Sequence, residues 1–218
     1  MNHEQLQKLA GETLKAGHDA MKKDRLYDAF FRGQAEVLND PALVDEITEY
    51  LSTKPEDKDR QNCYLLLGRI GRNIRSHDCA VTLLKCLESE ASEIPLLYLL
   101  GALDEVGIPD DVNLSKLIDC LNDDRPLVRQ PAIRALRKTP PGAAEEAVLA
   151  LLMHTKDLDD ICNCHKTLGR IGTEKSVQSI ECNLSSDNDN VKGTAANAIA
   201  RIRERLETAK LIFAGGNA

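Results

Sequence analysis

Tryptophan is absent from the 218-residue chain, and aromatic residues as a whole make up only 3% of it. A core without bulky rings has to be built from leucine, isoleucine, valine and alanine. Leucine and alanine lose little conformational freedom in a helix, whereas strands favour β-branched and aromatic residues. The scarcity of aromatic residues therefore favours an all-α protein.

Motifs that mark common chemistry are also missing. The chain has no phosphate-binding loop of the GxxxxGK[ST] or GxGxxG type and no GxSxG motif. Cys162, Cys164, His165 and Cys182 lie close together in the sequence, but neighbouring residues of a helix point in different directions, so one metal ion would not easily gather them. We therefore expect no enzymatic activity, no cofactor and no metal site.

Long apolar stretches are lacking as well. No run of about 20 apolar residues occurs, so we expect no membrane-spanning helix. Residues 1–24 contain acids and amides where a signal peptide needs an apolar stretch. The cysteines are odd in number, which favours reduced thiols over a disulfide framework. They are Cys63, Cys79, Cys86, Cys120, Cys162, Cys164 and Cys182. These features predict a cytoplasmic protein.

Apolar residues recur along the chain in two interleaved series, whose members lie 31 to 36 residues apart. The first series is Leu51, Leu87, Leu121, Leu152 and Leu184. The second series is Leu67, Leu103, Leu136, Leu168 and Ile199, each 15 or 16 residues after its partner in the first. Further apolar or small residues lie about one helical turn from these anchors, which is typical of helices. The sequence therefore predicts five repeats of two helices each.

Four strings of the sequence resemble the second helix of HEAT repeats of the phycobilisome-lyase-like type. They are LLLGRIG (65–71), KTLGRIG (166–172), LVRQPAIRAL (127–136) and NVKGTAANAI (190–199). The resemblance covers about residues 41–205 and departs in the second repeat, where Pro95 replaces the usual valine. It implies an α-solenoid. Proteins with such repeats include scaffolds, adaptors, DNA-glycosylase-like proteins and pigment-attachment enzymes, so the resemblance implies little about activity.

The predicted domain is an all-α solenoid of about five HEAT-like helix pairs over residues 41–207. Residues 1–40 are less regular, and we expect them to form a divergent capping helix pair, at about 3–22 and 25–38, because a terminal repeat presents a polar outer face. Residues 208–218 are predicted to be a flexible tail of the same structural domain.

Glycines and acidic or amide residues mark the expected helix ends. Glycine favours the left-handed conformation that often closes a helix, and the expected closing residues are Gly71, Gly107 and Gly172. Short polar side chains cap the start of a helix, and the expected caps are Asp124, Asp189 and Asn190.

Basic residues gather on the exposed face of the second helices, although acidic residues outnumber basic ones and the net charge is −7. A helical wheel places the residues two before and two after each second-series anchor at the centre of this face. The positions two after the anchors are Arg69, Glu105, Lys138, Arg170 and Arg201. The positions two before them are Leu65, Gly101, Arg134, Lys166 and Asn197. Arg134 and Lys166 are the first candidates for binding, because neither capping nor the helix dipole explains a basic residue in mid-helix.

These patterns predict a non-catalytic module for protein–protein interaction, such as an adaptor, a scaffold or an inhibitor of the immunity-protein type. The candidate partner-binding residues are Leu65, Arg69, Leu97, Glu105, Arg134, Lys138, Lys166, Arg170, Asn197 and Arg201. The acidic turns between paired helices are a second possible contact surface. Two other functions remain open: a pigment lyase- or isomerase-like subunit, which the resemblance implies, and nucleic-acid binding along the basic stripe.

Overall fold

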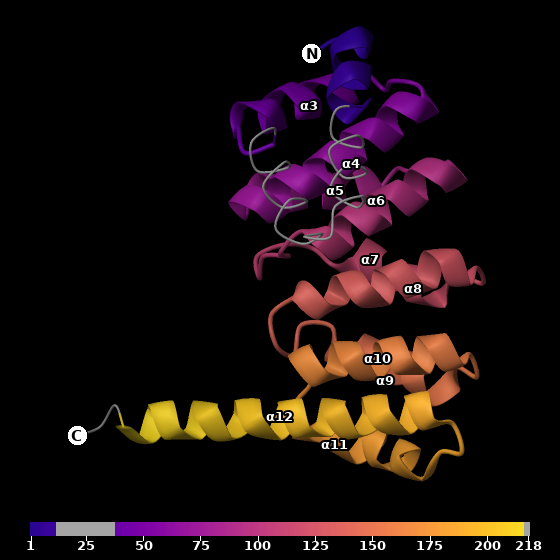
Figure 1. The fold of residues 1–218 in the computed structure, drawn as a ribbon, viewed down its shortest axis with the longest axis vertical. Coiled ribbons are helices and arrows are strands. Elements are labelled where there is room, and N and C mark those ends of the chain that lie inside the picture. Colours follow the sequence, from indigo (N-terminus) through magenta and orange to yellow (C-terminus); the bar gives the residue numbers. More distant parts are fainter. Residues whose placement is uncertain (12–37, 216–218) are drawn as a thin grey trace, which may run out of the picture. The chain divides into compact units, whose positions relative to one another are not determined.

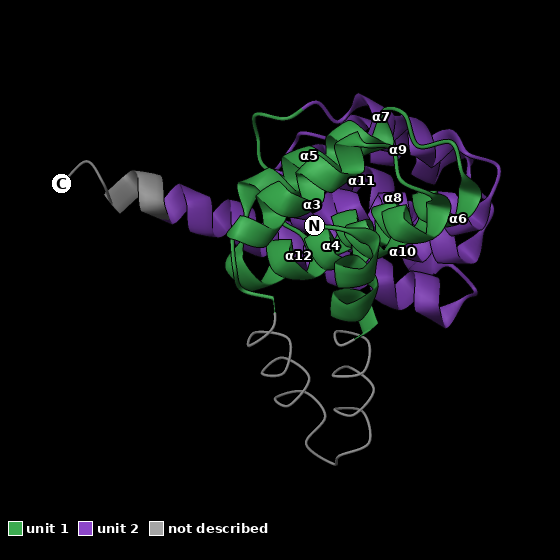
Figure 2. Ribbon diagram, turned by 90° about the horizontal axis from the view of Figure 1, so that it is seen from above, with its two compact units in different colours: residues 1–112 green, residues 113–218 purple. Residues whose placement is uncertain are grey.

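The computed structural model describes residues 1–11 and 38–215, and side chains within these ranges up to residue 211 (Figure 1). Every regular element in these ranges is an α-helix or a short 3-10 helix, which confirms the predicted all-α class. None of the described helices is long and apolar enough to cross a membrane. The chain divides into two compact units, Met1–Val112 and Asn113–Ala218, shown in green and purple in Figure 2.

Unit 1 contains an N-terminal helix, residues 3–11, and the first two predicted helix pairs. The pairs are α3 (Ala42–Ser52) with α4 (Asp57–Ile74) and α5 (His77–Leu87) with α6 (Glu93–Glu105). The second helices α4 and α6 pack side by side and form the largest helix contact of this unit (Figure 1). Leu6 and Ala10 of the N-terminal helix are buried.

Unit 2 contains the other three helix pairs. The first is α7 (Ser115–Asp119), continued by η1 (Cys120–Asn122), with α8 (Pro126–Ala135), continued by η2 (Leu136–Lys138). The second is α9 (Glu145–His154) with α10 (Leu158–Ile171). The third is α11 (Glu174–Glu181), continued by η3 (Cys182–Ser185), with α12 (Asp189–Gly215). The largest helix contact of this unit is again between two second helices, α10 and α12, and α10 also packs on α8 (Figure 1).

The second apolar series lies in the cores of the two units, as predicted. Its anchors are at most 5% exposed: Leu67, Leu103, Leu136, Leu168 and Ile199. The residues four positions earlier are fully buried: Cys63, Leu99, Ala132, Cys164 and Ala195. In the first series Leu87, Leu121 and Leu152 are buried, whereas Leu51 is half-buried and Leu184 is 41% exposed. No later helix pair of the described chain covers η3, which leaves this leucine in contact with solvent.

Helix α10 ends at Gly172 as predicted, whereas α4 ends later than predicted. Helix α4 continues through Gly71 to Ile74 and ends at Arg75, whose φ of 53° is left-handed. Gly71 therefore lies inside the helix. A glycine is needed there because a Cβ at this position would come within 2.5 Å of Val106 Cγ1. None of the three glycines predicted to close a helix has a positive φ; the only described glycine that does is Gly142. Close packing, not left-handed geometry, accounts for a glycine at position 71.

The capping of helices α8 and α12 differs from the prediction. Asn188 Oδ1 accepts a hydrogen bond from the backbone N–H of Asn190 at the start of α12. At α8 the residue before the helix is Arg125, and no side chain caps the first turn, so the predicted cap Asp124 is wrong; the carboxylate of Asp123 accepts from the backbone N–H of Arg125 ahead of the helix. A capping oxygen reaches the N–H groups two or three residues ahead of it, so the cap precedes the first helical turn.

The predicted terminal segments are described only in part. Residues 12–37, which include most of the predicted capping helices, lie outside the described residues, as do residues 216–218. Helix α12 continues without a break from the last repeat to Gly215. The division into a cap (1–40), repeats (41–207) and tail (208–218) stays a prediction.

Candidate functional site

The second helices of neighbouring repeats approach most closely where a glycine faces an alanine. In unit 1 a Cβ on Gly68 would lie 2.9 Å from Ala102 Cα, and in unit 2 a Cβ on Gly169 would lie 3.1 Å from Ala198 Cα. Each glycine directly follows a second-series anchor, and each alanine directly precedes the anchor of the next repeat. The LGRIG strings are therefore packing motifs that bring two second helices together.

In unit 2 this contact is bordered by a hollow of about 520 Å³ between η2, α10 and α12, which we name the basic hollow. Its lining residues are Arg137, Lys138, Lys166, Gly169, Arg170, Thr194, Asn197, Ala198 and Arg201. Five of these nine described residues are basic and none is acidic. The small side chains of Gly169 and Ala198 leave room for a ligand group between the flanking cations.

Three of the cations in the basic hollow are exposed: Lys166 and Arg170 on α10, and Arg201 on α12. Within the described part of the chain, these three side chains form no hydrogen bond or ion pair. Lys166 and Arg170 lie one helical turn apart, where two like charges destabilise an isolated helix. The helix dipole favours Arg170 in the last turn of α10, but it does not explain Lys166 in mid-helix. Both cations remain available to an anion.

The basic hollow contains only part of the predicted basic stripe. Arg134 is half-buried and does not line the hollow, although its carbonyl oxygen accepts a hydrogen bond of 3.2 Å from Arg137 Nε. Arg137, which lines the hollow, was not among the predicted residues. It directly follows its anchor, at the position that Gly68 and Gly169 occupy in other repeats. The signal that could have identified it is a large cation at a position that is glycine in two other repeats.

The predicted contact residues of unit 1 lie beside the equivalent contact between two second helices, α4 and α6. A second hollow, of about 310 Å³, is lined by Leu65, Leu97, Tyr98, Gly101, Ala102 and Glu105. Leu65 and Leu97 are half-buried and not exposed, contrary to the prediction. Arg69 Nη1 lies 2.9 Å from Glu105 Oε1, so these two predicted contact residues pair with each other. This hollow is accordingly apolar, with an ion pair at its edge.

Two arginines seven residues before their anchors connect one repeat to the next. Arg60 Nε donates to Glu90 Oε2 at 2.8 Å, and Arg129 Nε donates to Asp160 Oδ2 at 2.5 Å. Burial raises the pKa of Glu90, but the hydrogen bonds from Arg60 and other donors outweigh it and hold that pKa below its usual value. Glu90 lies in the acidic turn between α5 and α6, and Asp160 lies in the first turn of α10, directly after the acidic turn that precedes this helix. These carboxylates are engaged inside the fold.

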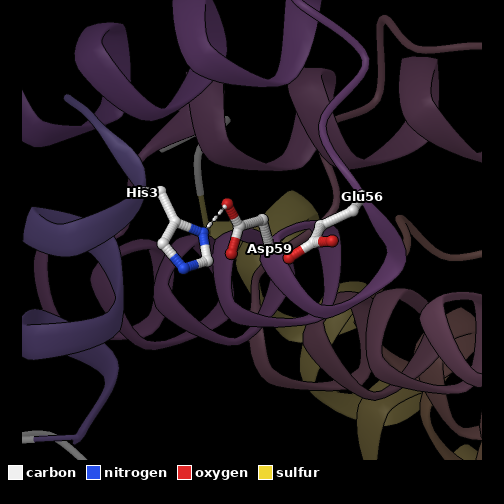
Figure 3. A group of neighbouring side chains, drawn as sticks. All are labelled: His3, Glu56 and Asp59. Atoms are coloured by element: carbon white, nitrogen blue, oxygen red, sulfur yellow. Dashed lines mark hydrogen bonds and ion pairs between the residues drawn. The ribbon is translucent and has the colours of Figure 1, made fainter.

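One group of potential metal ligands occurs in the described ranges. The ligand atoms of His3, Glu56 and Asp59 lie within 4.8 Å of one another (Figure 3). The buried carboxylate of Asp59 accepts hydrogen bonds from His3 Nδ1 at 2.7 Å, from Gln7 Nε2 at 2.8 Å and from the Tyr50 hydroxyl. The hydrogen bond to Asp59 raises the pKa of His3. Because both Asp59 oxygens already accept hydrogen bonds, we interpret the group as the contact that docks the N-terminal helix on α4.

The cysteines and His165 that lie together in the sequence are engaged in the fold of unit 2. His165 is fully buried, and its ring nitrogens lie 3.0 Å from Thr194 Oγ1 and 2.9 Å from Asn183 Nδ2. Burial lowers the pKa of His165 to about 4, so its ring is neutral at physiological pH. Burial raises the pKa of the Cys164 thiol. All seven cysteines are free thiols.

Comparison with known proteins agrees with this repeat geometry. Residues 114–200, which lie within unit 2, match the family model of HEAT repeats. The matched segment is therefore built of HEAT-like repeats, and the chain has the fold of a HEAT-like α-solenoid. The HEAT-like repeats of unit 2 include every residue of the basic hollow except Arg201, which follows the matched segment by one residue.

Solved structures show the same fold. A designed armadillo repeat protein superposes with a TM-score of 0.56 at 17% identity, over 90% of this chain and 91% of that one. An engineered protein solved as a structural genomics target gives a TM-score of 0.57 at 19% identity, over 94% of this chain and 98% of that one. No curated protein matches the chain. These likenesses establish the α-solenoid fold class of the HEAT-like repeats, while the phycobilisome-lyase-like subtype stays a prediction.

Proposed function

We propose that this chain is a protein-binding module that holds an acidic segment of a partner protein in the basic hollow of unit 2. One observation carries the proposal: five basic residues and no acidic one line a single hollow, in a chain whose net charge is −7. Solenoids of HEAT and armadillo type generally serve as scaffolds for protein interaction, which supports the choice of a protein as the partner.

Binding would begin with electrostatic attraction. Lys166, Arg170 and Arg201 have no competing partner among the described residues, so an approaching carboxylate does not have to break an existing ion pair. Such complementarity mainly raises the association rate and suppresses wrong partners, and salt weakens it. An adaptor, a scaffold or an inhibitor of a partner enzyme would each use the hollow in this way. The free thiols favour a reducing compartment such as the cytoplasm.

The proposal is tested with a short fluorescent peptide rich in aspartate and glutamate, whose binding is followed by anisotropy at low and high salt. The double variant Lys166→Glu with Arg170→Glu should weaken binding by about tenfold or more, which corresponds to ~1.4 kcal/mol. Binding should also weaken as salt is added.

A charge-matched control keeps the test specific to the hollow. Lys192→Glu with Arg203→Glu changes the net charge equally in the same unit, and both residues are exposed on α12 outside the hollow. This control should bind the peptide almost as well as the unmodified chain. Equal losses in the two double variants would overturn the proposal, because they would indicate a general charge effect. Binding of an oligonucleotide but not of the peptide would support the nucleic-acid alternative.

A further inference from the structure

We propose that the basic hollow recognises a phosphate group, so that the acidic segment of the partner is phosphorylated on a serine, threonine or tyrosine side chain. This inference rests on the proposed function, since it concerns the ligand chemistry of the same hollow. It follows from the density of positive charge, the directions from which that charge comes, and the lack of hydrogen-bond acceptors in the lining.

The basic hollow carries more positive charge than one carboxylate would neutralise. Lys166, Arg170 and Arg201, which form no ion pair among the described residues, line one space of about 520 Å³ together with Arg137 and Lys138. A carboxylate brings one negative charge and two oxygens. A phosphomonoester brings about −1.5 to −2 at neutral pH, together with three strong acceptor oxygens. One phosphorylated side chain therefore neutralises more of the positive charge in the hollow than one carboxylate does.

The cations come from three separate elements. Arg137 and Lys138 belong to η2, Lys166 and Arg170 to α10, and Arg201 to α12. A tetrahedral phosphate directs its oxygens to several sides at once, whereas both oxygens of a carboxylate lie in one plane. Guanidinium groups also bind phosphate through two parallel hydrogen bonds, and three of these five cations are arginines. The arrangement suits a phosphate better than an isolated carboxylate.

The lining offers few acceptors to a ligand that carries protons. The hydroxyl of Thr194 donates to Asn190 O at 2.9 Å. Its oxygen accepts from His165 Nδ1 at 3.0 Å because Asn183 Nδ2 donates to the other ring nitrogen, so both roles of the hydroxyl are in use. Apart from Thr194 and Asn197, every polar side chain in the lining is a cation that only donates. A phosphate dianion, which only accepts, complements such a lining.

Two observations favour a phosphorylated protein over nucleic acid. No aromatic side chain lines the hollow to stack on a base, and stacking on aromatic side chains is the usual device of single-strand binding. The net charge of −7 also repels a long polyanion outside the hollow. A short protein segment with one concentrated negative group meets neither difficulty.

The test compares three peptides of one acidic sequence that carry serine, glutamate or phosphoserine at one central position. The phosphoserine peptide should bind at least about tenfold more tightly than the glutamate peptide. Arg170→Lys with Arg201→Lys keeps the charge but removes the planar guanidinium groups. It should remove most of that preference and leave affinity for the glutamate peptide within about twofold. Arg203→Lys, outside the hollow, should leave the preference unchanged.

The outcomes separate this inference from the function on which it rests. Equal binding of the glutamate and phosphoserine peptides would overturn phosphate recognition and leave the acidic-segment proposal standing. No binding of any peptide would reject both. Competition by inorganic phosphate at the concentration at which the phosphopeptide binds would show that a free anion is the ligand and would overturn the protein source. Tighter binding of a single-stranded oligonucleotide than of the phosphopeptide would overturn it in favour of nucleic acid.

Discussion

Gly169 on α10 packs directly against Ala198 on α12, and a methyl group added to the glycine would lie 3.1 Å from the alanine Cα and 3.4 Å from its Cβ. Gly68 and Ala102 repeat this relationship in unit 1, with 2.9 Å to both atoms. Residues beside the two contacts line the two hollows, so packing between repeats and the candidate binding surface depend on the same positions.

The close contacts predict opposite effects for two glycine-to-alanine changes. Gly68→Ala should lower the free energy of unfolding by about 1–3 kcal/mol, because the new methyl group meets helix backbone. Gly193→Ala, on an exposed part of α12 with nothing within 4 Å, should raise it by about 0.5–1 kcal/mol through better helix propensity. Urea unfolding followed by circular dichroism measures both. A stabilising Gly68→Ala would contradict the packing role.

Loss of Arg129 should be costly because it leaves a charge without its partner inside unit 2. The Asp160 side chain is fully buried, and Arg129→Met should destabilise the chain by about 3 kcal/mol or more. Arg203→Met, which breaks an exposed pair with Glu181, should cost less than about 1 kcal/mol. Adding Asp160→Leu to Arg129→Met should recover part of the loss. An additive, larger loss in that double variant would argue against an uncompensated buried charge.

Because His165 is buried, we expect the chain to lose stability in mild acid. Its pKa falls from 6.5 to about 4 on folding, chiefly through burial, so the unfolded chain binds a proton first as the pH drops. Its contribution is complete above pH 6.5 and is lost as the pH falls toward 4, with about 2 kcal/mol gone by about pH 5. His165→Gln should flatten this part of the pH profile of the urea midpoint. An unchanged profile would show that His165 does not titrate as inferred.

The contact between His3 and Asp59 predicts a pH dependence of opposite sign. The folded pKa of His3 is raised, so the stabilisation is fully present below the usual value of 6.5 and is lost as the pH rises through the raised pKa. Burial raises the pKa of Asp59, but hydrogen bonds from Tyr50, His3 and Gln7 outweigh it and keep the carboxylate charged over this range.

This docking contact is measured by hydrogen exchange of residues 3–11. After correction for the intrinsic exchange rate, protection should be greater at about pH 5.5 than at about pH 8.5. His3→Gln should make protection independent of pH while Gln7 still donates to Asp59. Equal protection of the unmodified chain at both pH values would remove His3 from the docking of the N-terminal helix.

The sequence by itself determined the helix pairs and their cores. A helix buries one face, so anchors spaced by whole repeats identify the helices and their inward side without reference to any neighbour. This pattern predicts that Leu67 and Leu168 are buried and that Lys166 and Arg201 are exposed, as the structure shows. These properties belong to one helix at a time.

Only the tertiary structure decided which surface residues lie together. Arg69 and Arg170 occupy the same repeat position, yet Arg69 is paired with Glu105, whereas Arg170 lines the basic hollow and an adjoining one that Glu204 also lines. Arg137 enters the basic hollow from another repeat, because packing of α8 and α12 on α10 brings η2 and Arg201 to its two sides. A helical wheel places a side chain around its own axis. The distance between charges on different helices depends on how closely those helices pack, which between α10 and α12 is governed by the contact of Gly169 with Ala198.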